Sequence, residues 1–359
     1  MNNEYGGRRR LISAGLETRE LDAMLVTHPA SVRYLTGYAG SNGALLVLPD
    51  DATFFTDPRY AIQSRREITC RTQICRGPIV TAVATLAAAR RVRRLGFEPA
   101  HISFDGYDRL RAKLPLNASL EPVAGWLEAH RMLKSHAEIA AIRRSVKTNS
   151  RTFELVVRRV RAGMREQDLA AEIDYQMRRL GAEKPSFETI VAMGERSALP
   201  HAHPGDTALA NGQLVLIDMG AFQDGYASDM TRMLFLGRPT ARMKSLYGAV
   251  LEAQLAAIDA VRPGVTGGQV DRQARRVLRA HKLDRAFVHS TGHGLGLEIH
   301  ELPRIGRKDA TPLAAGMAIT IEPGAYLEGF GGVRIEDTVV VTASGCEVLT
   351  PTSKELRVL

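Results

Sequence analysis

The chain has 359 residues, of which 45% are hydrophobic and 24% charged, and its formal net charge is +9. This length predicts two domains and a large hydrophobic core. No stretch approaches the roughly 18 consecutive apolar residues of a membrane helix, and the N-terminus lacks the apolar core of a secretory signal. We therefore expect a cytoplasmic protein without a membrane partner.

The positive charge is scattered rather than concentrated. Arginine pairs such as Arg90-Arg91 and Arg143-Arg144 lie along segments with helical patterns, which is typical of solvated helix faces. No basic patch is interleaved with aromatic residues, so we expect no nucleic-acid partner. The three cysteines form no CxxC pair, which favours reduced thiols over a disulfide frame or a thiolate zinc site.

The first 125 residues alternate between strand and helix patterns. Residues 16–28 read as the end of a helix that passes into a strand, and residues 44–56 as two strands around a turn. Residues 58–67 and 79–94 have helical patterns. This alternation predicts an α/β layer structure, and no catalytic constellation is visible within it.

Apolar spacing between Trp126 and Arg161 predicts helical structure, and we place the domain junction there, with domains at 1–128 and 129–359. Residues 166–180 form a second predicted helix. The remainder mixes both patterns, with strands predicted at 214–218, 233–237, 317–324 and 337–342 and helices at 241–261 and 268–281. Helices followed by strands predict an α+β second domain.

Three histidines and three glycines lie within residues 289–300, HSTGHGLGLEIH. The glycines argue against a regular helix and for a loop that passes into a strand, packed closely around something. A Gly-rich loop with hydrogen-bonded histidines is the alternative interpretation. We expect the histidines to converge at an active site.

Acidic residues border four predicted strands. Asp218 closes LVLID, Asp229 precedes MLFLG, and Glu322 and Glu336 each follow an isoleucine. Singly, Asp218 and Asp229 could form turns and Glu322 could cap one, while Glu336 could pair with Arg334. Jointly, facing carboxylates repel one another unless cations lie between them. The oxygen-rich set, taken with a histidine, favours manganese, cobalt, iron or zinc, and four carboxylates suit two ions better than one.

Five segments resemble one family: SFETIVAMGERSALPH (186–201), IDMGAFQDGYASDMTR (217–232), HSTGHGLGLEIHELPR (289–304), TIEPG (320–324) and VRIED (333–337). They are similar to proline peptidases of the pita-bread metallopeptidase superfamily, peptidase family M24. The likeness covers about residues 130–359. The first 125 residues resemble the creatinase-type N-terminal domain. The expected fold is therefore α+β, with a pita-bread catalytic domain and a smaller α/β creatinase-like N-terminal domain.

The resemblance implies specific roles for individual residues. A dinuclear centre, most readily of manganese, would be held by Asp218, Asp229, His289, Glu322 and Glu336. The substrate site would be lined by His201, His293, His300, Arg304, Phe187 and Ile299. Within that site we expect Glu322 to act as general base, His300 to stabilise the oxyanion, and His201 to lie near the leaving nitrogen or the terminal carboxylate.

The resemblance leaves several activities open. We favour removal of the N-terminal residue from peptides with proline second, an Xaa-Pro aminopeptidase, over cleavage of Xaa-Pro dipeptides by a prolidase. Arg304 could bind a dipeptide carboxylate, but the HELPR run occurs in both groups. Creatinase lacks the ligand set, methionine aminopeptidases lack the leading domain, and a non-catalytic binding protein would not need five intact ligands. By analogy with the family, we expect a homodimer.

Overall fold

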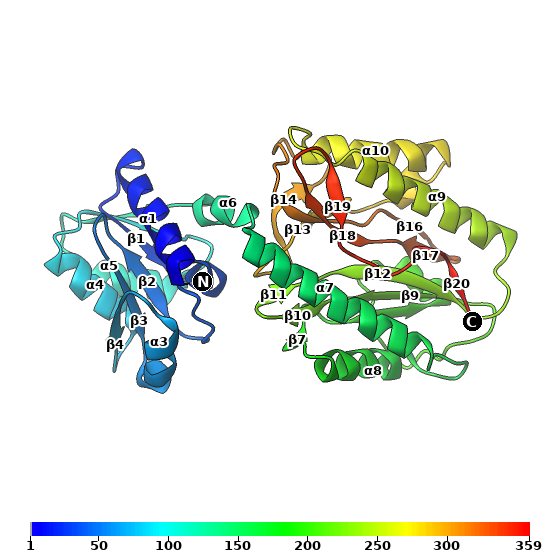
Figure 1. Cartoon of the computed structure of the whole chain (residues 1–359), viewed down its shortest axis with the longest axis horizontal. Helices are drawn as coiled ribbons and strands as arrows, with labels where there is room; N and C mark the ends of the chain where they lie inside the picture. Colours follow the sequence, from blue (N-terminus) through cyan, green and yellow to red (C-terminus); the bar gives the residue numbers. More distant parts are fainter. Residues whose placement is uncertain (1) are drawn as a thin grey trace. The chain divides into compact units, whose positions relative to one another are not determined.

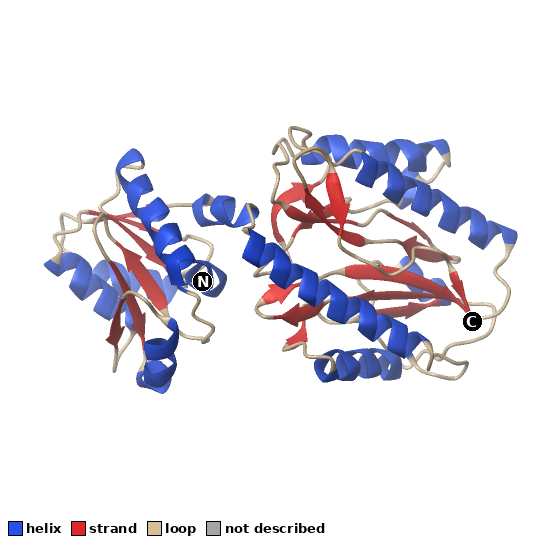
Figure 2. Cartoon of the chain, in the orientation of Figure 1, coloured by secondary structure: helices blue, strands red, loops and turns tan. Residues whose placement is uncertain are grey.

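The computed structural model describes residues 2–359, with side chains from residue 4 onward. The chain forms two compact units, Met1–His130 and Arg131–Leu359. Each unit is built around its own sheets, which Figure 1 colours along the sequence and Figure 2 by secondary structure. Among the described residues, no helix is both long and apolar enough to cross a membrane.

The N-terminal unit contains a six-stranded mixed sheet in the order β4-β3-β2-β1-β5-β6. Its central strand β1 (Ala23–Val26) is buried at all four positions, as expected where helices cover both faces of a sheet. This architecture confirms the predicted α/β layer. The other elements are α1 (Asn2–Thr18), α2 (Pro29–Thr36), β2 (Ala44–Val47), β3 (Ala52–Thr56), α3 (Ala61–Glu67), β4 (Arg71–Ile74), α4 (Ile79–Ala89), β5 (Arg94–Phe97), α5 (Phe104–Lys113), β6 (Ser119–Pro122) and α6 (Trp126–Met132), which continues into the second unit.

The second unit combines long helices with largely antiparallel sheets. In Figure 1 the green helices α7 and α8 and the yellow helices α9 and α10 lie on opposite sides of the strands. The helices are α7 (His136–Val157), α8 (Glu166–Arg179), α9 (Ala241–Asp259) and α10 (Gly267–Ala280). The strands are β7 (Lys184–Pro185), β8 (Ile190–Met193), β9 (Leu214–Met219), β10 (Ala221–Gln223), β11 (Tyr226–Ala227), β12 (Met230–Phe235), β13 (Gly292–Gly294), β14 (Glu301–Ile305), β15 (Ala318–Ile321), β16 (Gly324–Leu327), β17 (Gly331–Arg334), β18 (Asp337–Val341), β19 (Cys346–Val348) and β20 (Arg357–Val358).

Strand β9 separates two hydrophobic cores. Leu214 and Leu216 pack in the core that contains α9 and α10, whereas Val215 and Ile217 pack in the core that contains α8. Because side chains alternate along a strand, Asp218 continues the row of Leu214 and Leu216. The carboxylate therefore points from the end of this row toward the half of the unit that carries β13, β15 and β18.

The stretch predicted to be helical from residue 126 to residue 161 is two helices, α6 and α7. The break contains Ser135, whose side chain accepts a hydrogen bond from the Glu138 backbone, while the Glu138 side chain accepts one from the Ser135 backbone. This reciprocal capping box starts a new helix. The sequence SHAE at residues 135–138 has the pattern of a capping box. The prediction joined the two helices because the apolar residues keep a helical spacing across the break.

Candidate metal centre

The four predicted carboxylates lie at or next to the ends of four strands. Asp218 is in β9, Asp229 directly precedes β12, Glu322 directly follows β15 and Glu336 directly precedes β18. Asp218, Asp229 and Glu336 are buried, with 8%, 5% and 1% of their surface exposed. One ligand atom each of Asp229, His293 and Glu336 lies within 4.8 Å of the other two. The structure thus brings the distant acidic segments together around a common centre.

His293, rather than the expected His289, lies beside the carboxylates. His293 Nε2 lies 3.3 Å from Glu322 Oε1 and 3.6 Å from Asp229 Oδ2. Its Nδ1 donates to the carbonyl of Gly294 at 3.0 Å, which leaves Nε2 unprotonated toward the carboxylates. This is the tautomer that a metal-binding imidazole requires.

His289, expected from the sequence to be the ligand, has both ring nitrogens occupied elsewhere. Its Nδ1 donates to the Ser290 carbonyl at 2.7 Å and its Nε2 accepts from the Tyr326 hydroxyl at 2.8 Å. Burial, reinforced by the nearby charge of Arg334, lowers the pKa of His289 to about 4, so the ring is neutral at pH 7. We therefore correct the expectation and assign the candidate ligand position to His293.

Three oxygens of the cluster have no hydrogen-bond partner although they are buried: Asp218 Oδ1, Asp229 Oδ1 and Glu336 Oε1. An unpartnered buried carboxylate oxygen is costly unless a cation binds it. Burial and the neighbouring carboxylates raise the pKa of Asp229 and of Glu336, and burial raises the pKa of Glu322 to about 7. The raised pKa values show that these carboxylates repel one another when they are ionised, and a cation between them removes this repulsion. The donor set therefore fits divalent metal ions.

The cluster includes one cation and one phenol that the sequence did not assign to it. The Arg334 guanidinium donates to Asp218 Oδ2 at 2.6 Å and to the Tyr326 hydroxyl at 2.7 Å. The sequence suggested Arg334 as a partner for Glu336, but it pairs with Asp218 instead. Burial raises the pKa of Tyr326 to about 12, which keeps its hydroxyl protonated for the bond to His289.

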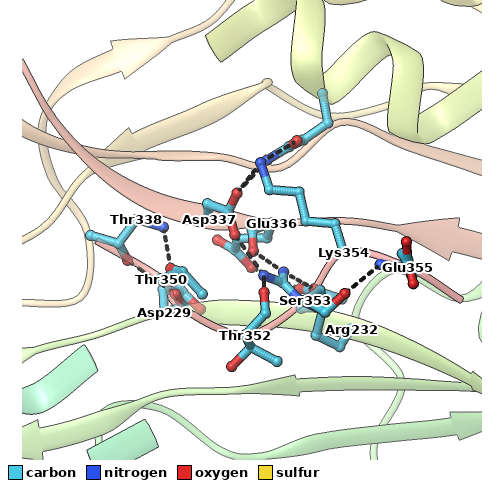
Figure 3. A network of polar contacts seen from close by, with 12 residues as sticks. Asp229, Arg232, Glu336, Asp337, Thr338, Thr350, Thr352, Ser353, Lys354 and Glu355 are labelled. Atoms are coloured by element: carbon cyan, nitrogen blue, oxygen red, sulfur yellow. Dashed lines mark hydrogen bonds and ion pairs between the residues drawn. The ribbon is translucent and has the colours of Figure 1, made fainter. Parts of the chain in front are cut away.

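A second buried network lies behind Glu336 and is shown in Figure 3. Arg232 donates to the backbone carbonyl of Glu336 at 2.5 Å and to Asp337 Oδ1 at 2.7 Å. Asp337 is fully buried and also pairs with Lys354 Nζ at 2.6 Å. Thr338 Oγ1 donates to the Asp229 carbonyl at 3.0 Å. These bonds fix the backbone of two ligand positions, and they tie the C-terminal segment to the site.

The residues expected to line the substrate site have different placements. The rings of His300 and His293 are 4.4 Å apart in an edge-to-face arrangement, and Arg304 lies directly opposite His293 in the β13–β14 ladder. His289 and Arg304 line an open pocket of about 510 Å³ together with Arg307 and Lys308. Burial and the neighbouring His293 lower the pKa of His300. His300 and Arg304 are therefore both neighbours of His293.

The remaining expected residues border this region less directly. His201 follows the 3₁₀ helix Gly194–Ala198, and its charge contributes to the pKa of both His300 and Glu322. Phe187 packs against Gly220, next to β9, where an added Cβ would lie 2.7 Å from the Phe187 ring. Ile299 is half-buried and directly precedes His300. We keep all three as candidate substrate contacts.

Family models match both parts of the chain. Residues 140–343 match the model of metallopeptidase family M24, and residues 8–133 match the creatinase/prolidase N-terminal domain. The chain belongs to metallopeptidase family M24. This membership confirms the expected pita-bread fold with a creatinase-type N-terminal domain and makes the protein a metal-dependent hydrolase. It also confirms the expectation that divalent metal ions are required.

Known M24 proteins are similar over nearly the whole chain. The Xaa-Pro dipeptidase of Pyrococcus furiosus is 34% identical over 344 residues, which covers 95% of this chain and 97% of that protein. The structure of an Xaa-Pro dipeptidase from Bacillus anthracis superimposes with a TM-score of 0.96 at 34% identity and covers 99% of this chain and all of that one. An X-Pro aminopeptidase from Thermotoga maritima gives 0.89 at 34% identity, with coverages of 95% and 98%.

Proposed function

We propose that this M24 protein is an Xaa-Pro dipeptidase that hydrolyses the bond before proline with two divalent ions. The observation that carries this proposal is the convergence of four carboxylates, Asp218, Asp229, Glu322 and Glu336, with His293. Three oxygens of these carboxylates lack a hydrogen-bond partner. The M24 relatives from Pyrococcus furiosus and Bacillus anthracis are named Xaa-Pro dipeptidases. Their names support the dipeptidase better than the aminopeptidase that we favoured from the sequence.

In this proposal the ligands are Asp218, Asp229, His293, Glu322 and Glu336. Bound ions supply the Lewis acidity that activates water and polarises the scissile carbonyl. The oxygen-rich donor set makes manganese our first choice, with cobalt, iron or zinc as alternatives. Arg334 pairs with Asp218, and this charge-assisted bond fixes the carboxylate's orientation.

The chain's own groups perform the proton transfers and the orientation of the substrate. Glu322 has a pKa near neutrality and is placed to accept the proton of the attacking water. His300, next to His293, would donate a hydrogen bond to the developing oxyanion, and His201 would lie near the leaving nitrogen or the carboxylate. Proline suits such a site because its amide has no N–H, so recognition has to come from side chains.

Arg304 is the candidate partner of the dipeptide's carboxylate. It lies opposite His293 across β13–β14 and lines the pocket with Arg307 and Lys308. The Arg304 residue is exposed. An exposed guanidinium beside the reacting centre can bind a carboxylate through two parallel hydrogen bonds.

The deciding experiment compares three substrates with the same first two residues: an Xaa-Pro dipeptide, its C-terminal amide and an Xaa-Pro-Xaa tripeptide. We expect the dipeptide to be turned over fastest, and Arg304→Met to raise its KM with little effect on the amide. Faster cleavage of the tripeptide would show an aminopeptidase. Activity that persists unchanged in a strong chelator would contradict the metal-dependent mechanism itself.

The subunit arrangement is a separate part of the proposal. By analogy with the family we expect a homodimer in which the N-terminal domain of one subunit borders the site of the other. Analytical ultracentrifugation of the metal-loaded protein tests this directly. A monomer with full activity would exclude a contribution from a second subunit.

A further inference from the structure

The segment that carries His300 has no regular secondary structure. Residues 295–300 lie between β13 and β14, and neither strand extends through them. His300 nevertheless has a defined position, with its ring 4.4 Å from that of His293. A side chain in an irregular segment needs tertiary contacts to hold it, because no ladder of backbone hydrogen bonds fixes its position.

The contacts come from Glu301, the residue after His300. Its carboxylate is buried and receives two cations, Arg131 at 2.5 Å to Oε1 and Lys134 at 3.1 Å to Oε2. Arg131 also pairs with Glu298 at 2.6 Å. His300 is thus flanked in the chain by two acidic residues that are bound to the same guanidinium.

The cations are themselves well fixed. The side chains of Arg131 and Lys134 are 3% and 2% exposed. The Lys134 backbone N–H donates to the Gly316 carbonyl at 3.0 Å, just before β15, which directly precedes Glu322. The segment between α6 and α7 is therefore attached to the same strand that presents a candidate metal ligand.

Packing closes the segment around the Glu301 carboxylate. A Cβ added to Gly296 would lie 2.8 Å from Glu301 Oε2 and 3.1 Å from Lys134 Cε. The backbone N–H of Glu298 also donates to Glu301 Oε1 at 3.2 Å. The segment wraps around this one carboxylate, which fixes the path of residues 296–301 together with the pairing of Glu301 with Gly294 in the β13–β14 ladder.

Electrostatics argue against a purely stabilising role. Buried ion pairs lose hydration, and well-packed apolar residues of similar size often give equal or greater stability. What a buried, hydrogen-bonded pair does provide is a fixed geometry. Two buried cations on one carboxylate are more than the stability of a short irregular segment requires.

We propose that Arg131 and Lys134 are positioning residues that hold His300 in its reactive orientation through Glu301. The inference rests on the proposed function, in which His300 stabilises the oxyanion. It adds a role for the α6–α7 junction, a segment that contributes no group to the reacting centre. Displacing a hydrogen-bond donor by about 1 Å is enough to reduce turnover about 100-fold.

A double-mutant cycle between Lys134→Met and His300→Ala tests this role. We expect kcat for the Xaa-Pro substrate to fall about tenfold in Lys134→Met and about 100-fold in His300→Ala, with KM nearly unchanged in the first. If Lys134 acts through His300, the double variant stays within about twofold of His300→Ala, because the two residues form one functional unit. Losses that multiply to about 1000-fold would overturn the proposal.

A second measurement does not depend on activity. Hydrogen exchange of the amides in residues 296–301 should be at least about tenfold faster in Lys134→Met, while exchange in β9 and β15 stays unchanged. The Kd of the metal-free Lys134→Met protein for Mn²⁺, measured by calorimetry, should stay within about threefold of the parent value, since all candidate ligands remain. Unchanged exchange in residues 296–301 would contradict the inference.

Two further variants guard against misfolding and general effects. If Lys134→Met does not fold, the pair Lys134→Met with Glu301→Gln keeps the buried charge closer to balance and should give the same kcat loss and the same dependence on His300. The matched control is Arg143→Gln, which removes an exposed pair with Glu347 in the same unit and should leave kcat unchanged. If the parent protein cleaves no Xaa-Pro peptide, the proposed function fails. The exchange experiment still decides whether the contacts of Arg131 and Lys134 with Glu301 hold residues 296–301 in place.

Discussion

The affinity of the metal-free protein, prepared with a chelator, for Mn²⁺ should fall steeply as the pH is lowered from about 8 to about 5.5. Metal ligands have to be deprotonated, so protons compete with the ions for the carboxylates. Burial raises the pKa of Glu322 to about 7, so this group alone weakens apparent binding about 30-fold at pH 5.5 but hardly at pH 8. Asp229 and Glu336, whose pKa values are also raised, steepen the dependence.

Titration calorimetry in buffers of different ionisation enthalpy measures both the affinity and the number of protons released. We expect net proton release at pH 5.5 and less at pH 8. In Glu322→Gln the pH dependence should be weaker by about the factor assigned to Glu322, roughly 30-fold. An affinity that does not change between the two pH values, with no proton released, would refute the assignment of these carboxylates as ligands.

The same raised pKa has a consequence for the stability of the metal-free protein. In the folded state Glu322 keeps its proton up to about pH 7, whereas the ordinary pKa of a glutamate is 4.5. Protonated Glu322 therefore adds about 3 kcal/mol to the free energy of unfolding below pH 4.5, and this contribution is lost as the pH rises through 7. The lowered pKa of His289 has the opposite effect at acidic pH, so the quantity to measure is the difference between parent and Glu322→Gln in urea unfolding with chelator. A difference that is constant with pH would contradict the value of the Glu322 pKa.

Three further results are expected. His293→Ala should abolish tight Mn²⁺ binding, whereas His289→Ala should keep it within about tenfold, since His289 has hydrogen-bond partners instead of carboxylates; equal losses in calorimetry would show that the structure does not distinguish the two. Lys354→Met should weaken Mn²⁺ binding about tenfold by loosening Asp337 behind Glu336, and an unchanged Kd would show that the network in Figure 3 serves only stability. Ser135→Ala should lower the free energy of unfolding by about 1 kcal/mol through loss of the α7 cap, and urea unfolding without any change in midpoint would exclude that contribution.

The sequence predicted much of the fold because its signals are local. Apolar runs placed the strand that ends with Asp218 and the strand that follows Glu336, and β9 and β18 are found where they were predicted. Acidic residues at the ends of apolar runs indicated a shared cation, because buried carboxylates tolerate one another only around positive charge. These features depend on neighbours in the chain, which a sequence displays.

The choice between His289 and His293 was decided by the tertiary structure. Both are histidines in a Gly-rich segment, four positions apart, and no local signal separates them. Only the placement of β13 against β14 and β15 turns the His293 ring toward Glu322 and leaves His289 against Tyr326. The direction of a side chain depends on which strands pair, and this pairing joins segments that are not neighbours in the chain, as Gly294 and Ile319 show.

The partners of the site residues were likewise beyond the sequence. Arg334 pairs with Asp218 across 116 positions, and Lys134 reaches Glu301 from the start of the unit. A charged residue can pair with any of many opposite charges, and the sequence gives no preference among them. The sequence thus determined which chemical groups the protein has and on which elements they lie, while the packed structure decided which of them meet, because only packing excludes water and fixes the distances on which metal binding and proton transfer depend.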